Sequence, residues 1–336
     1  MEQSEKTLDM IVNLCKNRGY VFPGSEIYGG LANSWDYGPL GVEFKNNVKK
    51  AWLKKFVQER PYNVGLDAAI IMNPQTWVTT GHVSSFSDPL LDCRACKARH
   101  RADKLIGEEH PEVNVDAMSF DEMDAMMYKI EGEDLYLIGT SEHSMIGKFI
   151  DTINDEEKLP YTLTSYSPCF RKEKGAHGIE ERGVYRIHQF EKQEMIVVCK
   201  PEESKAWYDK LWKNTVDLFR SLDIPVRTLE CCSGDLADLK VKSCDVEAWS
   251  PRQKKYFEVG SCSNLGDAQA RRLKIRIKGK DGRKYFAHTL NNTVVAPPRM
   301  LIAFLENNLN EDGSVNIPKA LQPYMGGIEK IVPKHE

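Results

Sequence analysis

The stretch Ser165–Val198 constrains the fold of this chain more than any other, because two runs of strand-forming residues flank a charged loop with three glycines. We predict strands over Ser165–Phe170 and Val184–Val198, joined into a hairpin. A helical pattern over Glu202–Leu222 precedes further strand-like runs. Strands joined by hairpins and long helical crossings indicate an α+β fold, a mostly antiparallel sheet flanked by helices. The other predicted strands are Val226–Cys232, Cys244–Trp249, Lys255–Ser261 and Phe286–Asn291.

The second strand of this hairpin has an unusual face. Alternate side chains of a strand point the same way. The set that shares this face is Arg186, His188, Phe190, Lys192 and Glu194. A strand that only built a core would place apolar groups here, whereas this face offers a guanidinium, an aromatic ring and a carboxylate. Such groups bind a phosphate or carboxylate, a flat base and an ammonium, so the face predicts a ligand site. An edge hairpin with two solvated faces is the alternative.

Composition limits the classes of function. The 336 residues suffice for one large domain or two modest ones, and 41% hydrophobic with 28% charged residues is typical of a soluble globular protein. No apolar run approaches the roughly 20 residues of a membrane span and no signal peptide begins the chain, so we expect a cytoplasmic protein without a membrane partner. Nine scattered cysteines indicate reduced thiols. A net charge of −3 predicts no DNA partner, and RNA binding only through a local patch.

The part of the chain from Leu135 onward resembles one enzyme family over many ordered strings. Phe170–Glu173 (FRKE) and Arg186–Glu194 (RIHQFEKQE) resemble the second signature motif of class II aminoacyl-tRNA synthetases, in its seryl-tRNA synthetase form. Asn291–Asn308 resembles the third motif, a strand, an arginine and a helix. The resemblance implies the class II aminoacyl-tRNA synthetase fold. Further matching strings are Tyr136–Ser144, Ser233–Leu236, Cys244–Trp249, Glu258–Asn264, Gln269–Arg272, His288–Thr293 and Ala320–Gly327.

The beginning of the chain resembles another member of the same class. Gly29–Phe56 and Met72–Cys93 are similar to the N-terminal catalytic segment of dimeric glycyl-tRNA synthetases, including their first motif. Here we predict a helix over Val42–Gln58 and a buried strand over Val64–Met72. The likeness implies a homodimer that pairs through this region. We therefore predict a glycyl-like interface segment (residues 1–105), an acidic, methionine-rich seam without chemistry (106–134) and a seryl-like catalytic core (135–336).

The resemblance implies a set of residues that bind ATP. Arg171 and Arg299 would neutralise the phosphates and are the predicted catalytic residues. Glu258 and Ser261 would hold Mg²⁺, which prefers hard carboxylate and hydroxyl oxygens. The full set implied for ATP is Arg171, Glu173, Phe190, Glu258, Ser261 and Arg299.

The resemblance also implies an amino-acid site. Thr140 and Glu142 would bind the α-ammonium of the substrate, and Arg171 its carboxylate. Glu194 and Thr293 would hold a side-chain hydroxyl. Each of these residues is unremarkable alone, and their order along the chain is what carries the prediction.

Cys93 and Cys96, with His100, form half of a zinc knuckle. No second CxxC pair follows, so two thiols without metal are favoured over a Zn²⁺ site.

Together these features predict that serine is activated with ATP and Mg²⁺ to seryl-adenylate and then transferred to tRNA. Neither the long helical hairpin of seryl enzymes nor the anticodon domain of glycyl enzymes is visible, so we expect poor unaided charging of tRNA. The alternatives are activation of glycine, a synthetase-like ligase that loads a carrier protein or small acceptor, and an inactive regulatory paralogue.

Overall fold

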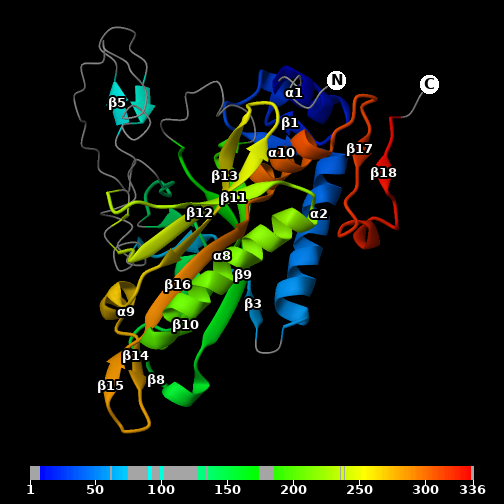
Figure 1. Cartoon of the computed structure of the whole chain (residues 1–336). Coiled ribbons are helices and arrows are strands. Elements are labelled where there is room, and N and C mark those ends of the chain that lie inside the picture. Colours follow the sequence, from blue (N-terminus) through cyan, green and yellow to red (C-terminus); the bar gives the residue numbers. More distant parts are fainter. Residues whose placement is uncertain are drawn as a thin grey trace.

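In the computed structural model, a seven-stranded sheet forms the centre of the molecule (Figure 1). Six of its strands pair antiparallel, and only β3 runs parallel to its neighbour β9. The predicted mostly antiparallel sheet flanked by helices is therefore confirmed. In order across the sheet, the strands are β11 (Val226–Glu230), β12 (Lys242–Ser250), β13 (Lys255–Asn264), β16 (His288–Val295), β10 (Gln189–Cys199), β9 (Tyr161–Phe170) and β3 (Val64–Leu66).

The structure describes most of the chain, but not the whole of it. The predicted zinc ligands Cys93 and Cys96 and most of the predicted seam lie outside the described residues. The three predicted segments of the chain stay predictions. The described residues are 8–60, 63–74, 90–92, 99–101, 127–133, 135–173, 185–234, 236–237 and 239–333.

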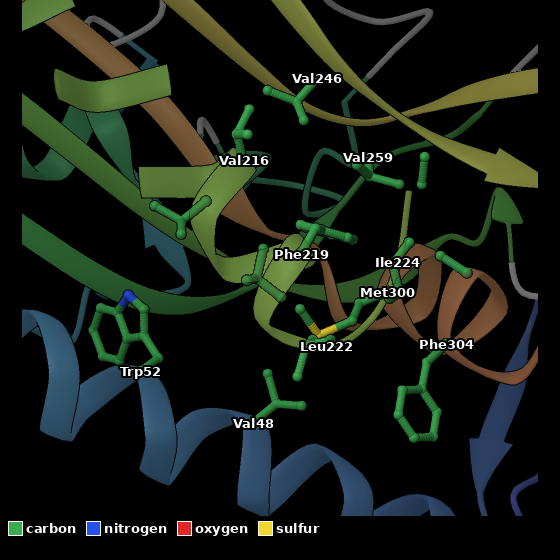
Figure 2. Close-up of a cluster of buried hydrophobic side chains, with 14 of the residues drawn as sticks. Val48, Trp52, Val216, Phe219, Leu222, Ile224, Val246, Val259, Met300 and Phe304 are labelled. Atoms are coloured by element: carbon green, nitrogen blue, oxygen red, sulfur yellow. The ribbon is translucent and has the colours of Figure 1, made fainter. Parts of the chain in front are cut away.

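One face of the sheet is covered by three helices. They are α2 (Pro39–Leu53), α8 (Ser204–Ser221) and α10 (Pro297–Asn308). Figure 2 shows their side chains meeting in a single cluster, with Trp52, Phe219 and Met300 among its members. Met195 and Val197 of β10 point into the same cluster. The core beneath this face thus joins the beginning of the chain to its end.

Among the described residues, helices cover the opposite face at one end of the strands. There Ile196 and Val198 of β10 pack against the short helices α7 (Glu142–Gly147) and α9 (Ala268–Leu273). Toward its beginning, β10 leaves this cover and its side chains on the same face become polar. Because alternate side chains of a strand point to opposite faces, β10 contributes core residues to both faces of the sheet along one part of its length. Along the other part, one of its faces carries the candidate site residues Phe190, Lys192 and Glu194.

Two strand predictions need correction. The predicted buried strand Val64–Met72 is divided into β3 and β4 (Ile71–Met72), and Val64 is 52% exposed. The division arises because β3 pairs with β9 whereas β4 pairs with β7 (Tyr136–Leu137). The predicted strand Val184–Val198 begins only at Gln189 as β10.

Smaller elements complete the described part of the chain. β14 (Arg276–Lys278) pairs with β15 (Lys284–Phe286) and with β8 (Ile153–Asp155) in a three-stranded sheet. Among the described residues, no helix is both long and apolar enough to cross a membrane. The remaining helices and strands are α1 (Leu8–Asn17), β1 (Val21–Pro23), β2 (Trp35–Tyr37), β5 (Leu90–Asp92), β6 (Arg99–Arg101), β17 (Val315–Asn316) and β18 (Lys330–Ile331).

Candidate active site

Glu194 and Thr293 meet at the centre of the sheet. β10 and β16 pair antiparallel, and the register places Glu194 directly opposite Thr293. The hydroxyl of Thr293 donates to Glu194 Oε1 at 2.7 Å. Glu194 is only 1% exposed, so this hydrogen bond lies in a region from which solvent is nearly excluded. The two residues predicted to hold a side-chain hydroxyl are therefore brought together.

Thr140 and Glu142 reach this pair from the turn that begins α7. Lys192 Nζ donates to Thr140 Oγ1 at 2.9 Å and forms an ion pair with Glu194. Asn291 Nδ2 donates to Glu142 Oε1 at 3.4 Å. The ammonium of Lys192 thus connects Thr140, predicted to bind the α-ammonium of the substrate, with Glu194, predicted to bind its hydroxyl.

The charge state of Glu194 is set by opposing influences. Burial raises the pKa of its carboxyl group, and the nearby carboxylate of Glu142 raises it further. Lys192 and the hydroxyl of Thr293 lower the pKa but do not fully compensate, so it stays above the ordinary value for glutamate. Glu194 Oε2 is buried and accepts no hydrogen bond from the described residues. This oxygen is therefore suited to accept a hydrogen bond from a ligand.

Arg171 directly follows β9 and lies beside the backbone of Gly139 and the aromatic ring of Phe190. Its Nε donates to the carbonyl oxygen of Gly139 at 3.1 Å, and its guanidinium carbon lies 5.4 Å from the centroid of Phe190. Its backbone N–H donates to the carbonyl of His188 at 2.9 Å. A guanidinium held by a backbone carbonyl and by a ring presents its remaining N–H groups in a fixed direction.

Arg299 stands in the first turn of α10, where the sequence predicts it. Its Nη1 lies 3.0 Å from Glu258 Oε2 and donates to the Glu258 carbonyl oxygen at 3.2 Å. The guanidinium also lies 4.7 Å from the ring centroid of Tyr185. Burial alone would raise the pKa of Glu258, but Arg299, and then Arg186 and Arg171, hold it below the ordinary value. The carboxylate is thus ionised and surrounded by cations.

Glu173 is held by Arg186, whose Nη1 donates to Glu173 Oε2 at 3.1 Å. The predicted face of alternate residues needs a correction here. Arg186 and His188 precede β10, where the backbone bends, so only Phe190, Lys192 and Glu194 belong to the face of the strand. The site keeps all of these groups, but Arg186 contacts Glu173 from the segment before β10.

A β-bulge brings the predicted magnesium ligands onto one face. Glu258 and Ser261 are three positions apart, which in a regular strand would place them on opposite faces. The register of β12 against β13 shifts so that Glu247 opposes Glu258 and Asp245 opposes Ser261. Because Asp245 and Glu247 are two residues apart, their partners lie on one face.

Asp245 is a further acidic group of this face. Its pKa is raised to about 6, first by burial and then by the charge of Glu258, while a hydrogen bond from Ser261 opposes both effects. The described residues contain no group of three or more His, Cys, Asp or Glu side chains able to hold a metal ion. Mg²⁺ commonly takes one or two carboxylates together with substrate phosphates, so a carboxylate and a hydroxyl fit this ion.

Four residues of the site received no role from the sequence. Lys192 lies on the predicted face of alternate residues, and Asn291 and Asp245 fall within the matching strings, so a signal existed for each. Tyr185, which stacks on Arg299 and meets Phe257 edge-on at 5.8 Å, had none that we recognise.

Comparison with known proteins identifies the family. A family model described as the tRNA synthetase class II core domain (G, H, P, S and T) matches residues 127–308. The chain belongs to this class II synthetase family. Similar curated proteins are the serine--tRNA ligases of Methanospirillum hungatei, 47% identical over 62% of this chain and 50% of that protein, and of Thermococcus sibiricus, 48% identical over 64% and 47%. This class II synthetase chain spans about half the length of the curated relatives it matches.

Solved structures of seryl enzymes extend the likeness of this class II synthetase to most of the chain. The seryl-tRNA synthetase from Pyrococcus horikoshii, complexed with ATP, superposes with a TM-score of 0.78 and 32% identity over 96% of this chain and 64% of that chain. The cytoplasmic serine-tRNA ligase from Naegleria fowleri, in complex with AMP, gives a TM-score of 0.76 and 29% identity. The predicted class II fold and the seryl resemblance are confirmed, and the glycyl likeness of residues 1–105 is a minor addition.

Proposed function

We propose that this class II synthetase activates serine with ATP to form seryl-adenylate and pyrophosphate. The observation that carries the proposal is the buried pair of Glu194 and Thr293, a hydroxyl-binding arrangement beside Arg171. The similar curated proteins are serine--tRNA ligases, and the two similar structures hold ATP and AMP. Those likenesses support ATP as the nucleotide of this chain.

The chemistry is mainly alignment and charge neutralisation. An oxygen of the serine carboxylate attacks the α-phosphorus, and the bond from that phosphorus to the pyrophosphate oxygen breaks. Arg171, held beside Gly139 and Phe190, binds the carboxylate and the α-phosphate, while the ring of Phe190 supports the adenine. Arg299, at the start of α10, neutralises the departing phosphates. Glu173, held by Arg186, also contacts the nucleotide.

Glu258 and Ser261 would hold Mg²⁺ on the bulged face of β13, with Asp245 bound to Ser261. When bound, Mg²⁺ supplies positive charge that is shared among the phosphate oxygens. The role of Glu258 here is consistent with its lowered pKa, because an ionised carboxylate is the form that binds a cation.

Selection of serine rests on its hydroxyl. In the proposed complex, the serine hydroxyl donates to Glu194 Oε2, while Thr140 and Glu142 receive the α-ammonium. Glycine and alanine leave the buried oxygen without a partner. A site that hydrogen-bonds a substrate hydroxyl can reject the analogue lacking it by roughly 10⁴-fold. Glycine is therefore the main competitor to exclude, given the glycyl-like beginning of the chain.

Amino-acid-dependent exchange of pyrophosphate into ATP, measured without tRNA across the twenty amino acids, tests this function. We expect exchange with serine and very little with glycine. Arg171→Ala should abolish it, whereas Arg272→Ala, an exposed arginine on α9, should leave it intact. Exchange with glycine equal to that with serine would favour a glycyl enzyme, and no exchange at all would favour an inactive paralogue.

We further propose that tRNA is the acceptor and that the protein acts in the cytoplasm as a homodimer. The names of the relatives support tRNA as the acceptor, and an aminoacylation assay with tRNA, compared with loading of a carrier protein, tests it. The dimer is supported by the edge position of β3 and by the exposed apolar side chains of Val64 in β3 and Ile71 in β4.

A further inference from the structure

Lys192 is a buried lysine at the centre of the candidate site. Its side chain is 9% exposed, and a lysine is rarely so buried unless it is paired. Its ammonium group donates to Thr140 Oγ1 and forms an ion pair with Glu194. Both partners belong to the amino-acid site, and neither belongs to the groups around Arg299. The position of Lys192 thus connects it to recognition of the amino acid.

The groups that influence the charge of Glu194 come from three elements. Glu142 at the start of α7 is anionic, Thr293 of β16 is a neutral donor, and Lys192 of β10 itself is the cation in contact with the carboxylate. Burial and Glu142 both favour the protonated form of Glu194. Lys192 is therefore the group that most favours the ionised form.

The same contact fixes the orientation of the carboxylate. Lys192 and Thr293 both bind Oε1 of Glu194, so Oε2 stays available as an acceptor. A protonated Glu194 could carry its proton on Oε2 and would then face the substrate hydroxyl as a donor. The serine hydroxyl would then accept this hydrogen bond, and because a neutral hydrogen bond is weaker than a charge-assisted one, serine would lose much of its advantage over alanine.

We propose that Lys192 is a positioning residue for amino-acid selection, which holds Glu194 as an oriented, ionised acceptor for the substrate hydroxyl and ties it to Thr140. This inference rests on the proposed activation of serine. Lys192 acts through Glu194 and touches neither ATP nor the reacting phosphorus in this account. Its contribution should therefore disappear when Glu194 can no longer be ionised.

A double-mutant cycle of Lys192→Met and Glu194→Gln tests the inference by exchange kinetics with serine and alanine. We expect Lys192→Met to lower kcat/KM for serine by about 10²-fold, mainly through KM, and to lower kcat/KM for alanine much less. In the Glu194→Gln background, Lys192→Met should lower kcat/KM for serine by less than about threefold. The pH profile gives an independent readout: without Lys192, the acid limb of kcat/KM for serine should move to higher pH, and Lys192→Arg should restore it in part.

Lys192→Gln serves as a second variant if Lys192→Met folds poorly, because glutamine keeps a donor for Thr140 but no charge. It should still move the acid limb. The role of Lys192 would be overturned if the two substitutions lowered kcat/KM for serine independently, so that their fold losses multiplied. It would also be overturned if the acid limb of the pH profile did not move in folded, active variants. Either result would leave serine activation intact. Absence of serine-dependent exchange in the wild-type chain would overturn the proposed function and this inference together.

Discussion

Thr293 brings two separable groups to the proposed amino-acid site. Its hydroxyl donates to Glu194. We expect its methyl to narrow the space beside the β-carbon of the substrate. Thr293→Ser keeps the hydroxyl and removes the methyl. We expect serine exchange to change little and threonine exchange to rise by roughly tenfold, the usual value of one methyl group in a pocket. Exchange kinetics with both amino acids measure this, and an unchanged threonine-to-serine ratio would show that another side chain excludes threonine.

At the scale of elements, α10 is anchored at the end opposite Arg299. Glu306 is 1% exposed and accepts hydrogen bonds from Ser250 and from Arg252 Nε, the latter at 2.9 Å, so α10 is tied to the turn between β12 and β13. Glu306→Gln keeps the size but leaves Arg252 without its carboxylate. We expect the free energy of unfolding to fall by about 2 kcal/mol in urea denaturation.

The control for this anchor is Lys205→Ala on α8, which breaks an exposed pair with Asp209. Exposed pairs contribute little, so a change below about 0.5 kcal/mol is expected. Equal effects of the two variants would mean that the buried contacts of Glu306 add nothing to the stability of α10.

β16 and α8 are joined where both begin, by a hydrogen bond between His288 Nδ1 and Ser204 Oγ at 3.0 Å. Burial lowers the pKa of His288, although Asp267 and Glu202 oppose it. The unfolded chain therefore takes up a proton before the folded one, and stability falls as pH decreases from above the ordinary histidine pKa of about 6.5 through the folded value.

His288→Gln should remove this part of the pH dependence. The difference in free energy of unfolding between wild type and variant should shrink between pH 7.5 and pH 5.5, measured by denaturant titration at each pH. A constant difference would mean that folding leaves the pKa of His288 unchanged, and a difference that grows toward low pH would mean that the folded state favours the imidazolium.

At the scale of the whole molecule, the proposed homodimer can be tested by substitutions of exposed apolar side chains. Val64 in the edge strand β3 is 52% exposed, and Ile71 in β4 is 51% exposed. We expect sedimentation to give a mass near twice 38.3 kDa, and Ile71→Asp to shift it toward the monomer. Val241→Asp, a substitution of an exposed side chain that directly precedes β12 and lies outside residues 1–105, should leave the dimer intact. A folded, active wild-type protein at the monomer mass would contradict the prediction.

Local patterns in the sequence predict the parts of this protein that depend on neighbouring residues. The pairing of β9 with β10 follows from two strand runs around a glycine-bearing loop, and the face of Phe190, Lys192 and Glu194 follows from a period of two. The place of Arg299 in the first turn of α10 follows from the strand and the paired prolines before it. These features need only backbone geometry and local side-chain preferences.

Only the tertiary structure decides which distant residues meet. Thr293 reaches Glu194 across 99 residues and Lys192 reaches Thr140 across 52, because β16 and the start of α7 are placed by packing of the whole core. The bulge that aligns Glu258 with Ser261 depends on the register of β12 against β13. A shift of one residue reverses the face of every later side chain at little local cost, so the summed burial across the sheet selects the register, and no short pattern in the sequence records it.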